Sequence, residues 1–277
     1  MMFWKYHGTG NDFILFEDFK LDAPDDPETV RKLCDRRFGV GANGILYINP
    51  AEDADATMRI INADGSEAEM CGNGIRCVAK HLYDFSIIRK KRMEIRTLAG
   101  LKKIECRVQK GEVKEVSVDM GAPSLDCRDI PMKCSGRLID RTIKVGGATV
   151  RGTAVSMGNP HFVTFQKITE KKMRELGPKI EIHPLFPRRT NTEFVRLVDG
   201  RLDVVVHERG AGWTLACGTG ACASAVAAAV GGLICYDEDV EVRLPGGSLW
   251  VRVARDLSSV TMRGPAVRVF KGEIETG

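Results

Sequence analysis

Apolar residues form two kinds of pattern along the chain. Runs of small and apolar residues follow a glycine-rich turn at Ile75–Tyr83 and at Ala221–Val230, and each run predicts a helix. Alternation of apolar and polar residues predicts strands at Val113–Met120, Thr142–Val145 and Asp203–His207. Small side chains let other elements approach a helix closely. The pattern therefore predicts an α+β protein with strands packed around small-residue helices.

The same features occur twice, in the same order. Cys71 opens the turn Cys-Gly-Asn-Gly, and Cys217 opens Cys-Gly-Thr-Gly. An asparagine lies 60 residues before the first cysteine and 58 before the second, and another asparagine follows it by 32 residues. These asparagines are Asn11 and Asn43 in the first half and Asn159 and Asn191 in the second. A polar residue, Asn62 or Glu208, stands nine residues before each cysteine, which completes the evidence for a duplicated unit.

The repeat predicts the domain organisation. We expect two pseudo-symmetric α+β domains, each a mostly antiparallel β-sheet wrapped around a central α-helix. The first should span residues 1–119 and the second residues 120–265. Residues 266–277 include a strand-like segment, Val267–Glu273, which we expect to return to the first domain.

Composition narrows the class of protein. A chain of 277 residues with 43% hydrophobic residues can form two ordinary domains. The net charge is only +4 and is dispersed, whereas nucleic-acid binding needs clustered Lys and Arg. The start lacks the pattern of a signal peptide, and the longest apolar run, Ala221–Ile234, is too short to span a bilayer. We therefore expect a cytoplasmic enzyme with no membrane or nucleic-acid partner.

Nine cysteines is a high and odd count. Without a secretory signal or a Cys-x-x-Cys pair, we expect neither a disulfide framework nor a metal site. Cys77 and Cys222 lie within the predicted helices, so we expect them in the core. No motif surrounds the remaining five and no role is assigned to them; these are Cys34, Cys106, Cys127, Cys134 and Cys235.

Cys71 and Cys217 stand where chemistry is expected, at the predicted N-termini of the two helices. Free N–H groups and the helix dipole favour negative charge there, so we expect lowered thiol pKa values and a cradle for a carboxylate. Two sulfurs on opposite faces of one ligand could invert a stereocentre. One would remove a proton and the other would return a proton to the opposite face.

Several long motifs resemble the diaminopimelate epimerase family over essentially the whole chain. They are residues 7–13 (HGTGNDF), 62–77 (NADGSEAEMCGNGIRC), 157–161 (MGNPH), 189–195 (RTNTEFV), 208–212 (ERGAG) and 215–223 (LACGTGACA). The resemblance implies epimerisation of LL-diaminopimelate to the meso form without pyridoxal phosphate or metal. It also implies a site between two domains, a homodimer, and a place in lysine biosynthesis, with peptidoglycan biosynthesis as a second use of the product left open.

The resemblance assigns roles residue by residue. Cys71 and Cys217 match the acid/base pair, and His161 and Glu208 match positions that tune the cysteines. The matched substrate-binding residues are Asn11, Asn62, Gly72, Asn73, Asn159, Asn191, Glu208, Arg209, Gly218 and Thr219. Asparagine supplies donors and an acceptor, and arginine can grip a carboxylate with two parallel bonds, as an amino-acid substrate requires. Alternatively, the asparagines could be turn residues, His161 could be structural, and Glu208 could pair with Arg209.

Two positions depart from the family pattern. Gly44 follows Asn43 where some members carry Gln, so no side chain can make that contact. Trp213 precedes the second cysteine turn where a smaller or polar residue is more familiar, and we expect it to pack near the mouth of the site.

Other functions remain alternatives. A proline or hydroxyproline racemase would use two cysteines, but its first motif typically carries His where this chain has Asn73. A phenazine-type isomerase lacks the paired cysteines. A thiol-based redox sensor would form a disulfide between the two sulfurs, and an amino-acid binding protein would bind without turnover. Exchange of the α-proton with heavy water separates the epimerase from the last two.

Overall fold

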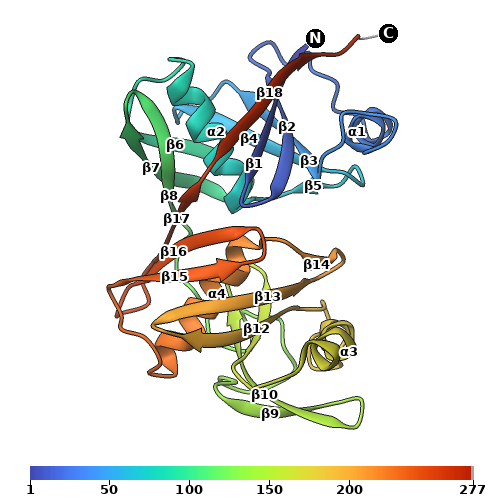
Figure 1. The fold of residues 1–277 in the computed structure, drawn as a ribbon, viewed down its shortest axis with the longest axis vertical. Helices are drawn as coiled ribbons and strands as arrows, with labels where there is room; N and C mark the ends of the chain where they lie inside the picture. The colour runs from blue at the N-terminus through green and yellow to red at the C-terminus, as the bar shows by residue number, and fades with distance from the viewer. Residues whose placement is uncertain (276–277) are drawn as a thin grey trace. The chain divides into compact units, whose positions relative to one another are not determined.

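The computed structural model describes residues 1–275 and divides the chain into two units (Figure 1). Unit 1 contains Met1–Asp119 and the chain from Arg263 onward, and unit 2 contains Met120–Met262. The last two residues of the expected C-terminal segment, 276 and 277, lie outside the described residues. Within residues 1–275 no helix is long and apolar enough to cross a membrane.

Unit 1 has a mixed sheet in the order β18-β1-β2-β3-β4-β6-β7-β8, with the short β5 on β4. Its strands are β1 (Met2–Gly8), β2 (Asn11–Glu17), β3 (Gly44–Asn49), β4 (Ala56–Asn62), β5 (Glu67–Ala68), β6 (Arg92–Thr97), β7 (Gly100–Gln109), β8 (Glu112–Asp119) and β18 (Val267–Glu273). β18 pairs antiparallel with β1, so the end of the chain lies beside its beginning (Figure 1).

Unit 2 has a sheet in the order β9-β10-β11-β12-β13-β15-β16, with the short β14 on β13. Its strands are β9 (Arg141–Val145), β10 (Ala148–Ser156), β11 (Pro160–Thr164), β12 (Asn191–Val198), β13 (Arg201–Glu208), β14 (Gly212–Thr214), β15 (Asp239–Leu244) and β16 (Gly247–Val253). In β17 (Val260–Pro265) the chain passes from unit 2 back to unit 1.

The two units repeat one topology. Along β1-β2-β3-β4-β6-β7 the pairings run antiparallel, parallel, antiparallel, parallel, antiparallel, and β10-β11-β12-β13-β15-β16 follows the same series. Parallel neighbours need a long crossover, which a helix usually supplies. Each of the four parallel pairs has its own crossover helix: α1 (Pro27–Cys34), α2 (Gly72–Asp84), α3 (Glu170–Glu181) and α4 (Gly218–Val230). The α+β fold with two pseudo-repeat units is therefore present.

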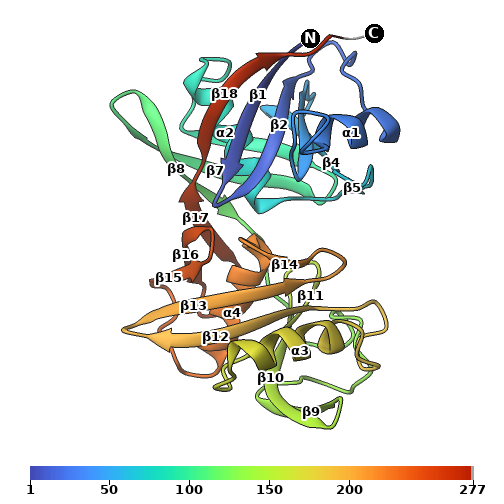
Figure 2. The same ribbon diagram turned by 45° about the vertical axis from the view of Figure 1, so that its right-hand side comes forward.

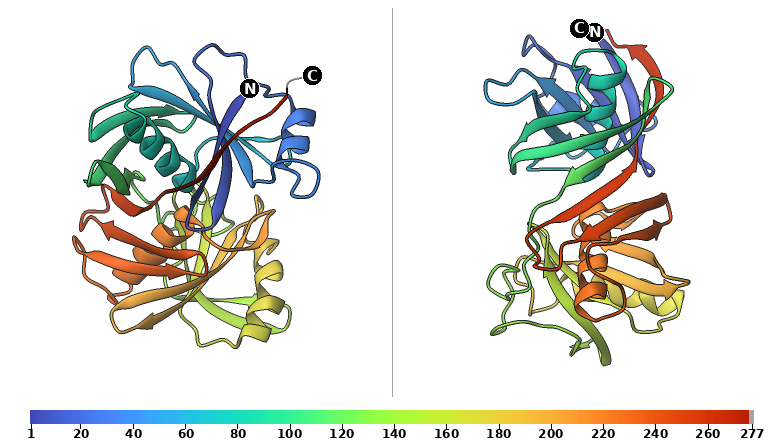
Figure 3. Two further views of the ribbon diagram at one scale, coloured as in Figure 1. Left: turned by 45° about the horizontal axis from the view of Figure 1, so that its top comes forward. Right: turned by 90° about the vertical axis from the view of Figure 1, so that its left-hand side faces the viewer.

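The two helices predicted from the small-residue runs, α2 and α4, are the buried centres of their units. α2 packs on β8, β1 and β2, and α4 packs on β16 and on β10 to β13. Figure 3 shows each helix surrounded by the strands of its own unit. Cys77 and Cys222 are fully buried within these helices, as predicted. Because alanine dominates α4, strands can approach it from several sides.

The outer helices α1 and α3 were not predicted. α1 has ordinary start signals, since Asp26 caps the N–H groups of Glu28 and Thr29, and Pro27 occupies the first turn. α3 lies against β12 and β13 (Figure 2). It contains Gly177 and Pro178, two residues with low helix propensity, so its sequence does not predict a helix. Gly177 is required because a side chain there would meet the Trp213 ring at 2.9 Å.

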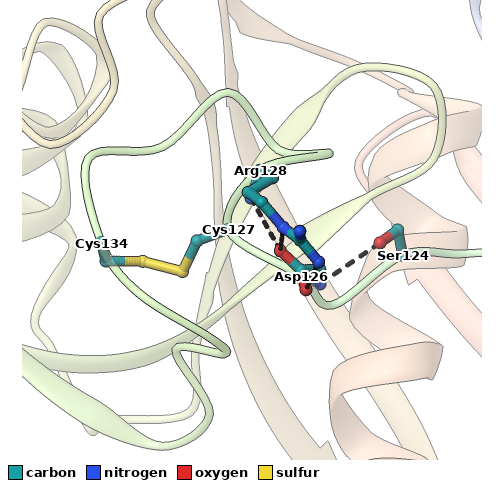
Figure 4. The surroundings of a disulfide bond; sticks show 5 residues. All are labelled: Ser124, Asp126, Cys127, Arg128 and Cys134. Carbon is teal, nitrogen blue, oxygen red and sulfur yellow. Dashed lines mark hydrogen bonds and ion pairs between the residues drawn. A yellow bond between two sulfur atoms is a disulfide. The ribbon is translucent and has the colours of Figure 1, made fainter.

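The expectation of no disulfide is wrong for one pair. Cys127 and Cys134, seven residues apart in unit 2, are joined by a disulfide with Cα atoms 5.8 Å apart (Figure 4). The loop between them folds back, because the N–H of Met132 donates to the carbonyl of Cys127. Asp126 shapes the entry to this loop by accepting from the N–H of Arg128. Local turns create the bridge, and these are not visible in cysteine spacing alone.

Candidate active site

Both motif cysteines cap the central helix of their unit. Cys71 is the N-cap of α2, and its Sγ accepts the N–H of Gly74 at 3.4 Å. Cys217 is the N-cap of α4, and its Sγ accepts the N–H of Gly220 at 3.3 Å. The predicted helix starts are thus confirmed. Gly72-Asn73 and Gly218-Thr219 form the first turns of the two helices, where the helix itself supplies no carbonyl acceptor for the backbone N–H groups.

In unit 1, an asparagine amide faces the Cys71 sulfur. The Nδ2 of Asn11 lies 3.9 Å from Cys71 Sγ. The Nδ2 of Asn43 donates to Asn11 Oδ1 at 2.8 Å, and Arg36 donates to Asn43 Oδ1 at 2.7 Å. These bonds fix the Asn11 amide with its nitrogen toward the sulfur. Asn11 and Asn43, which are 32 residues apart in the sequence, are thus paired directly in unit 1.

The other predicted unit 1 residues have structural partners. Asn62 ends β4 and donates to the Ser66 hydroxyl at 3.1 Å, as a turn residue does. The Asn73 side chain is buried and accepts from the Thr9 hydroxyl at 3.4 Å. Gly44 must be glycine, because a Cβ there would lie 2.7 Å from the carbonyl oxygen of Ile61.

Sequence reasoning missed Arg76, a fully buried arginine on α2. Its guanidinium donates to the carbonyls of Gly72 and Pro265 at 3.0 and 3.2 Å, and to the Thr9 hydroxyl at 3.4 Å. It thereby joins the first turn of α2, the turn after β1 and the end of β17. The available signal was a charged residue two positions after the Gly-Asn-Gly turn, on a run predicted to be a central helix.

In unit 2, Asn159 takes the place that Asn11 has in unit 1. Its Nδ2 lies 3.4 Å from the Thr219 hydroxyl, which is 3.5 Å from Cys217 Sγ. Its Oδ1 lies 2.9 Å from Nε2 of His161, and Nδ1 of the same ring lies 2.7 Å from Glu193 Oε1. His161 and Glu193 are both completely buried. Both ring nitrogens of His161 are therefore occupied within unit 2.

The environment of Cys217 differs from the expectation of a lowered thiol pKa. Burial raises the pKa of Cys217 well above its ordinary value, and the nearby carboxyl group of Glu208 raises it further. The contacts to Thr219 and to the N–H of Gly220 lower it, but less. The thiol form of Cys217 is therefore favoured over the thiolate.

The predicted residues that surround the end of β13 form one hydrogen-bonded loop. Asn191 Oδ1 accepts the N–H of Arg209 at 2.9 Å, and its Nδ2 donates to the carbonyl of Pro160 at 2.9 Å. Glu208 accepts from the Thr214 hydroxyl. The Arg209 side chain is exposed and donates to the carbonyl of Arg188 at 3.3 Å. The structure thus brings Glu208 close to Cys217, while the Arg209 side chain makes a bond with the main chain.

Trp213 has a packing role within unit 2. Its ring lies 6.0 Å from the Phe194 ring and 5.0 Å from the His207 ring, measured between centroids. The guanidinium of Arg174 on α3 lies 5.7 Å above it. Trp213 therefore anchors β14 to α3.

Known proteins share both the sequence and the fold of this chain. A model of the diaminopimelate epimerase family matches residues 3–125 and 153–269. A diaminopimelate epimerase from Moorella thermoacetica is 47% identical over 277 residues, covering 99% of each chain. One from Methanothermobacter thermautotrophicus is 46% identical over 281 residues, covering 98% of each.

Solved structures with much lower identity share the fold. A probable proline racemase from Agrobacterium radiobacter superposes with a TM-score of 0.74 at 15% identity, covering 100% of this chain and 93% of the other. A phenazine biosynthesis protein from Bacillus anthracis gives 0.73 at 16% identity, covering 100% and 99%. These likenesses show the architecture, whereas the family match and the close relatives extend over nearly the whole sequence. The chain therefore belongs to the diaminopimelate epimerase family.

Proposed function

We propose that the protein epimerises LL-diaminopimelate to meso-diaminopimelate, with Cys71 and Cys217 as the two proton-transfer groups and no cofactor. The observation that supports this most is the equivalence of the two cysteines. Each is the N-cap of the crossover helix between equivalent parallel strands, and each sulfur accepts the N–H three residues later. Duplicated acid/base groups suit a reaction that must work from both faces of one carbon.

The mechanism requires one thiolate and one thiol at the same time. Because burial and the Glu208 carboxyl group favour the protonated form of Cys217, we assign the resting thiol to Cys217. The mechanism then needs the thiolate on the other cysteine, Cys71. In one direction the Cys71 sulfur takes the α-proton, and Cys217 S–H gives its proton to the opposite face of the carbanion. The reaction ends with the proton on Cys71 and the negative charge on Cys217, and the reverse direction exchanges the roles.

The remaining predicted residues bind the substrate in this proposal. N–H groups in the first turns of α2 and α4 donate to carboxylate oxygens of the substrate and stabilise the charge that develops next to the α-carbon. Asparagine amides and charged side chains orient the amino groups and carboxylates; these are Asn11, Asn62, Asn159, Asn191, Glu208 and Arg209. His161 and Glu208 tune the reactive groups. The named relatives support diaminopimelate over proline as the substrate, because they are far more similar to this chain than the proline racemase is.

The biological setting follows from this activity as part of the proposal. The enzyme acts in the cytoplasm as a homodimer, supplies lysine synthesis, with peptidoglycan synthesis as the alternative use of its product, and has no membrane or nucleic-acid partner.

Isotope exchange tests the proposal. Reduced protein is incubated with LL-diaminopimelate in heavy water, and mass spectrometry follows deuterium at the α-carbon while chiral chromatography follows the meso product. We expect the parent to incorporate deuterium and to form the meso product, and we expect C71S and C217S to do both far more slowly. The exposed, motif-free Cys235 provides the control C235S, which should match the parent.

Three results would contradict the proposal. Absence of exchange under reducing conditions would favour a redox sensor. Binding without turnover, retained in both cysteine variants, would favour a binding protein. Near-parent turnover in either single cysteine variant would reject the two-base assignment.

A further inference from the structure

A buried acidic side chain lies behind the Asn159 amide in unit 2. Glu193 is on β12, completely buried, with Oε1 2.7 Å from His161 Nδ1. Its other oxygen, Oε2, is buried and has no hydrogen-bond partner among residues 1–275. Desolvation makes a carboxyl group at this buried position cost free energy, and only one of its two oxygens has a hydrogen-bond partner to offset that cost.

The contacts among Asn159, His161 and Glu193 define where the protons lie. Asn159 Oδ1 can only accept, so His161 Nε2 must carry a hydrogen to make the 2.9 Å contact. One further proton then lies between His161 Nδ1 and Glu193 Oε1. Burial raises the pKa of Glu193, and an unpartnered Oε2 is less costly on a neutral acid than on a carboxylate. Glu193 is therefore the neutral acid that donates to Nδ1.

Unit 1 shows that packing alone does not require an acid here. A Cβ on Gly220, the second glycine of the Cys217 motif, would lie 2.9 Å from Glu193 Oε1. The equivalent Cβ on Gly74 in unit 1 would lie 2.8 Å from a methyl carbon of Leu46. The space over the first turn of the central helix is thus filled by leucine in one unit and by glutamic acid in the other.

We propose that Glu193 is a positioning residue that acts through His161 to hold the Asn159 amide with its nitrogen toward the first turn of α4. A donor on Glu193 fixes the Nε2–H tautomer, and that tautomer fixes which end of the Asn159 amide accepts. In unit 1, Arg36 and Asn43 orient the Asn11 amide in the same sense. The kinetic consequence of this inference rests on the proposed epimerase function.

Two substitutions separate positioning from packing. Glu193→Leu copies the side chain that fills the equivalent space in unit 1 and removes the donor to His161. We expect it to unfold no earlier than the parent but to lose about tenfold or more in kcat/KM. Glu193→Gln keeps a donor in the same place and should stay within about threefold of the parent. Thr192→Val is the matched control, since Thr192 is the fully buried neighbour whose hydroxyl has no partner among the described residues.

A double-mutant cycle tests the route through Asn159. If Glu193 acts through that amide, E193L should have little further effect on kcat/KM in an N159A background. Full additivity would overturn the proposal, because a merely structural loss would act in both backgrounds. Equal damage in E193Q and E193L would also overturn it, since only one of them lacks the donor.

A measurement without substrate distinguishes this proposal from the proposed function. Histidine ¹⁵N shifts of the protein, which has five histidines, are assigned by comparison with H161Q. We expect a protonated Nε2 and a hydrogen-bonded Nδ1 in the parent and in E193Q, and a shifted, unbonded Nδ1 in E193L. Unchanged His161 shifts in E193L would overturn the positioning role. Absence of exchange in the parent, with the expected shifts present, would reject the epimerase function and leave the hydrogen-bonded pair established.

Discussion

The Cys127–Cys134 disulfide should contribute measurably to the stability of unit 2. The perturbation is reduction of the parent by dithiothreitol, compared with the same treatment of C127A/C134A. The bond closes a loop with a sequence separation of seven, and Cys127 is fully buried in a core cluster with Ile130 and Met132. Packing changes in the variant act with and without reductant, so the sensitivity to reductant isolates the bond itself.

The expected magnitude follows from the length of the loop. Closing about seven residues in the unfolded chain removes about 8 cal/mol/K of entropy, or about 2 kcal/mol at 25 °C, in the chain-entropy model. For a domain of this size, a change of that magnitude shifts the melting temperature by roughly 5–10 °C. The bond lies within unit 2, so only the transition that unfolds unit 2 should move.

Differential scanning calorimetry with and without reductant measures the effect, and mass spectrometry of alkylated peptides confirms the redox state of each cysteine. We expect the parent to melt earlier in reductant and C127A/C134A to be insensitive to it. Equal reductant sensitivity in both proteins would assign the effect to other thiols. A parent whose two cysteines alkylate freely without reductant would refute the bond.

Three further predictions follow from the ionisable groups. Burial raises the pKa of Asp12, but hydrogen bonds from Arg36 and Lys5 outweigh it and leave the pKa lowered. Ionised Asp12 therefore adds to the free energy of unfolding above about pH 4, and this stabilisation is lost in more acid solution. The stability gap between the parent and D12N, measured by urea unfolding, should therefore narrow as pH falls below about 4, and a gap independent of pH would contradict this. Because the pKa of Cys217 is raised, iodoacetamide should label it more slowly than exposed Cys235 at pH 8, and E208Q should speed labelling by removing a negative charge; slower labelling in E208Q would contradict the electrostatic cause. R76M should lose about 2–4 kcal/mol of stability because buried acceptors lose their donor, whereas R252M at an exposed ion pair should change it by less than about 1 kcal/mol.

Sequence periodicity predicted the central elements because it reflects burial. The runs after Cys71 and Cys217 became α2 and α4, and the alternating segments became β8, β9 and β13. The cysteines were predicted at the helix starts because glycine-rich turns before small-residue runs are local signals. The outer helix α3 was not predicted because it carries Gly177 and Pro178, which lower helix propensity. They are tolerated here through contacts with the rest of unit 2.

The partners of the site residues could not be predicted, because they depend on strands distant in sequence. Parallel pairing of β11 with β12 places His161 opposite Asn191 and brings Glu193 to the same ring, 32 residues along the chain. In the sequence Glu193 is an ordinary charged residue in a quoted motif, and Arg36 is an ordinary basic residue. The raised pKa of Cys217 was missed for the same reason. The helix N-terminus is visible in the sequence, whereas the burial of Cys217 and the neighbouring carboxyl group of Glu208 are not.

Differences between the two units matter as much as their likeness for the proposed mechanism. Two cysteines in identical surroundings that did not interact would have equal pKa values, and at most about half of the molecules would then hold one proton between them. Any larger share would have to come from the interaction between the two thiols. Raising the pKa of one thiol widens the pH range in which nearly every molecule carries one thiol and one thiolate. Burial and the carboxyl group of Glu208 provide that difference at Cys217. In the proposed mechanism, the duplicated helices thus supply two similar proton-transfer groups, and the unequal side chains around them favour the mixed protonation state that stereoinversion needs.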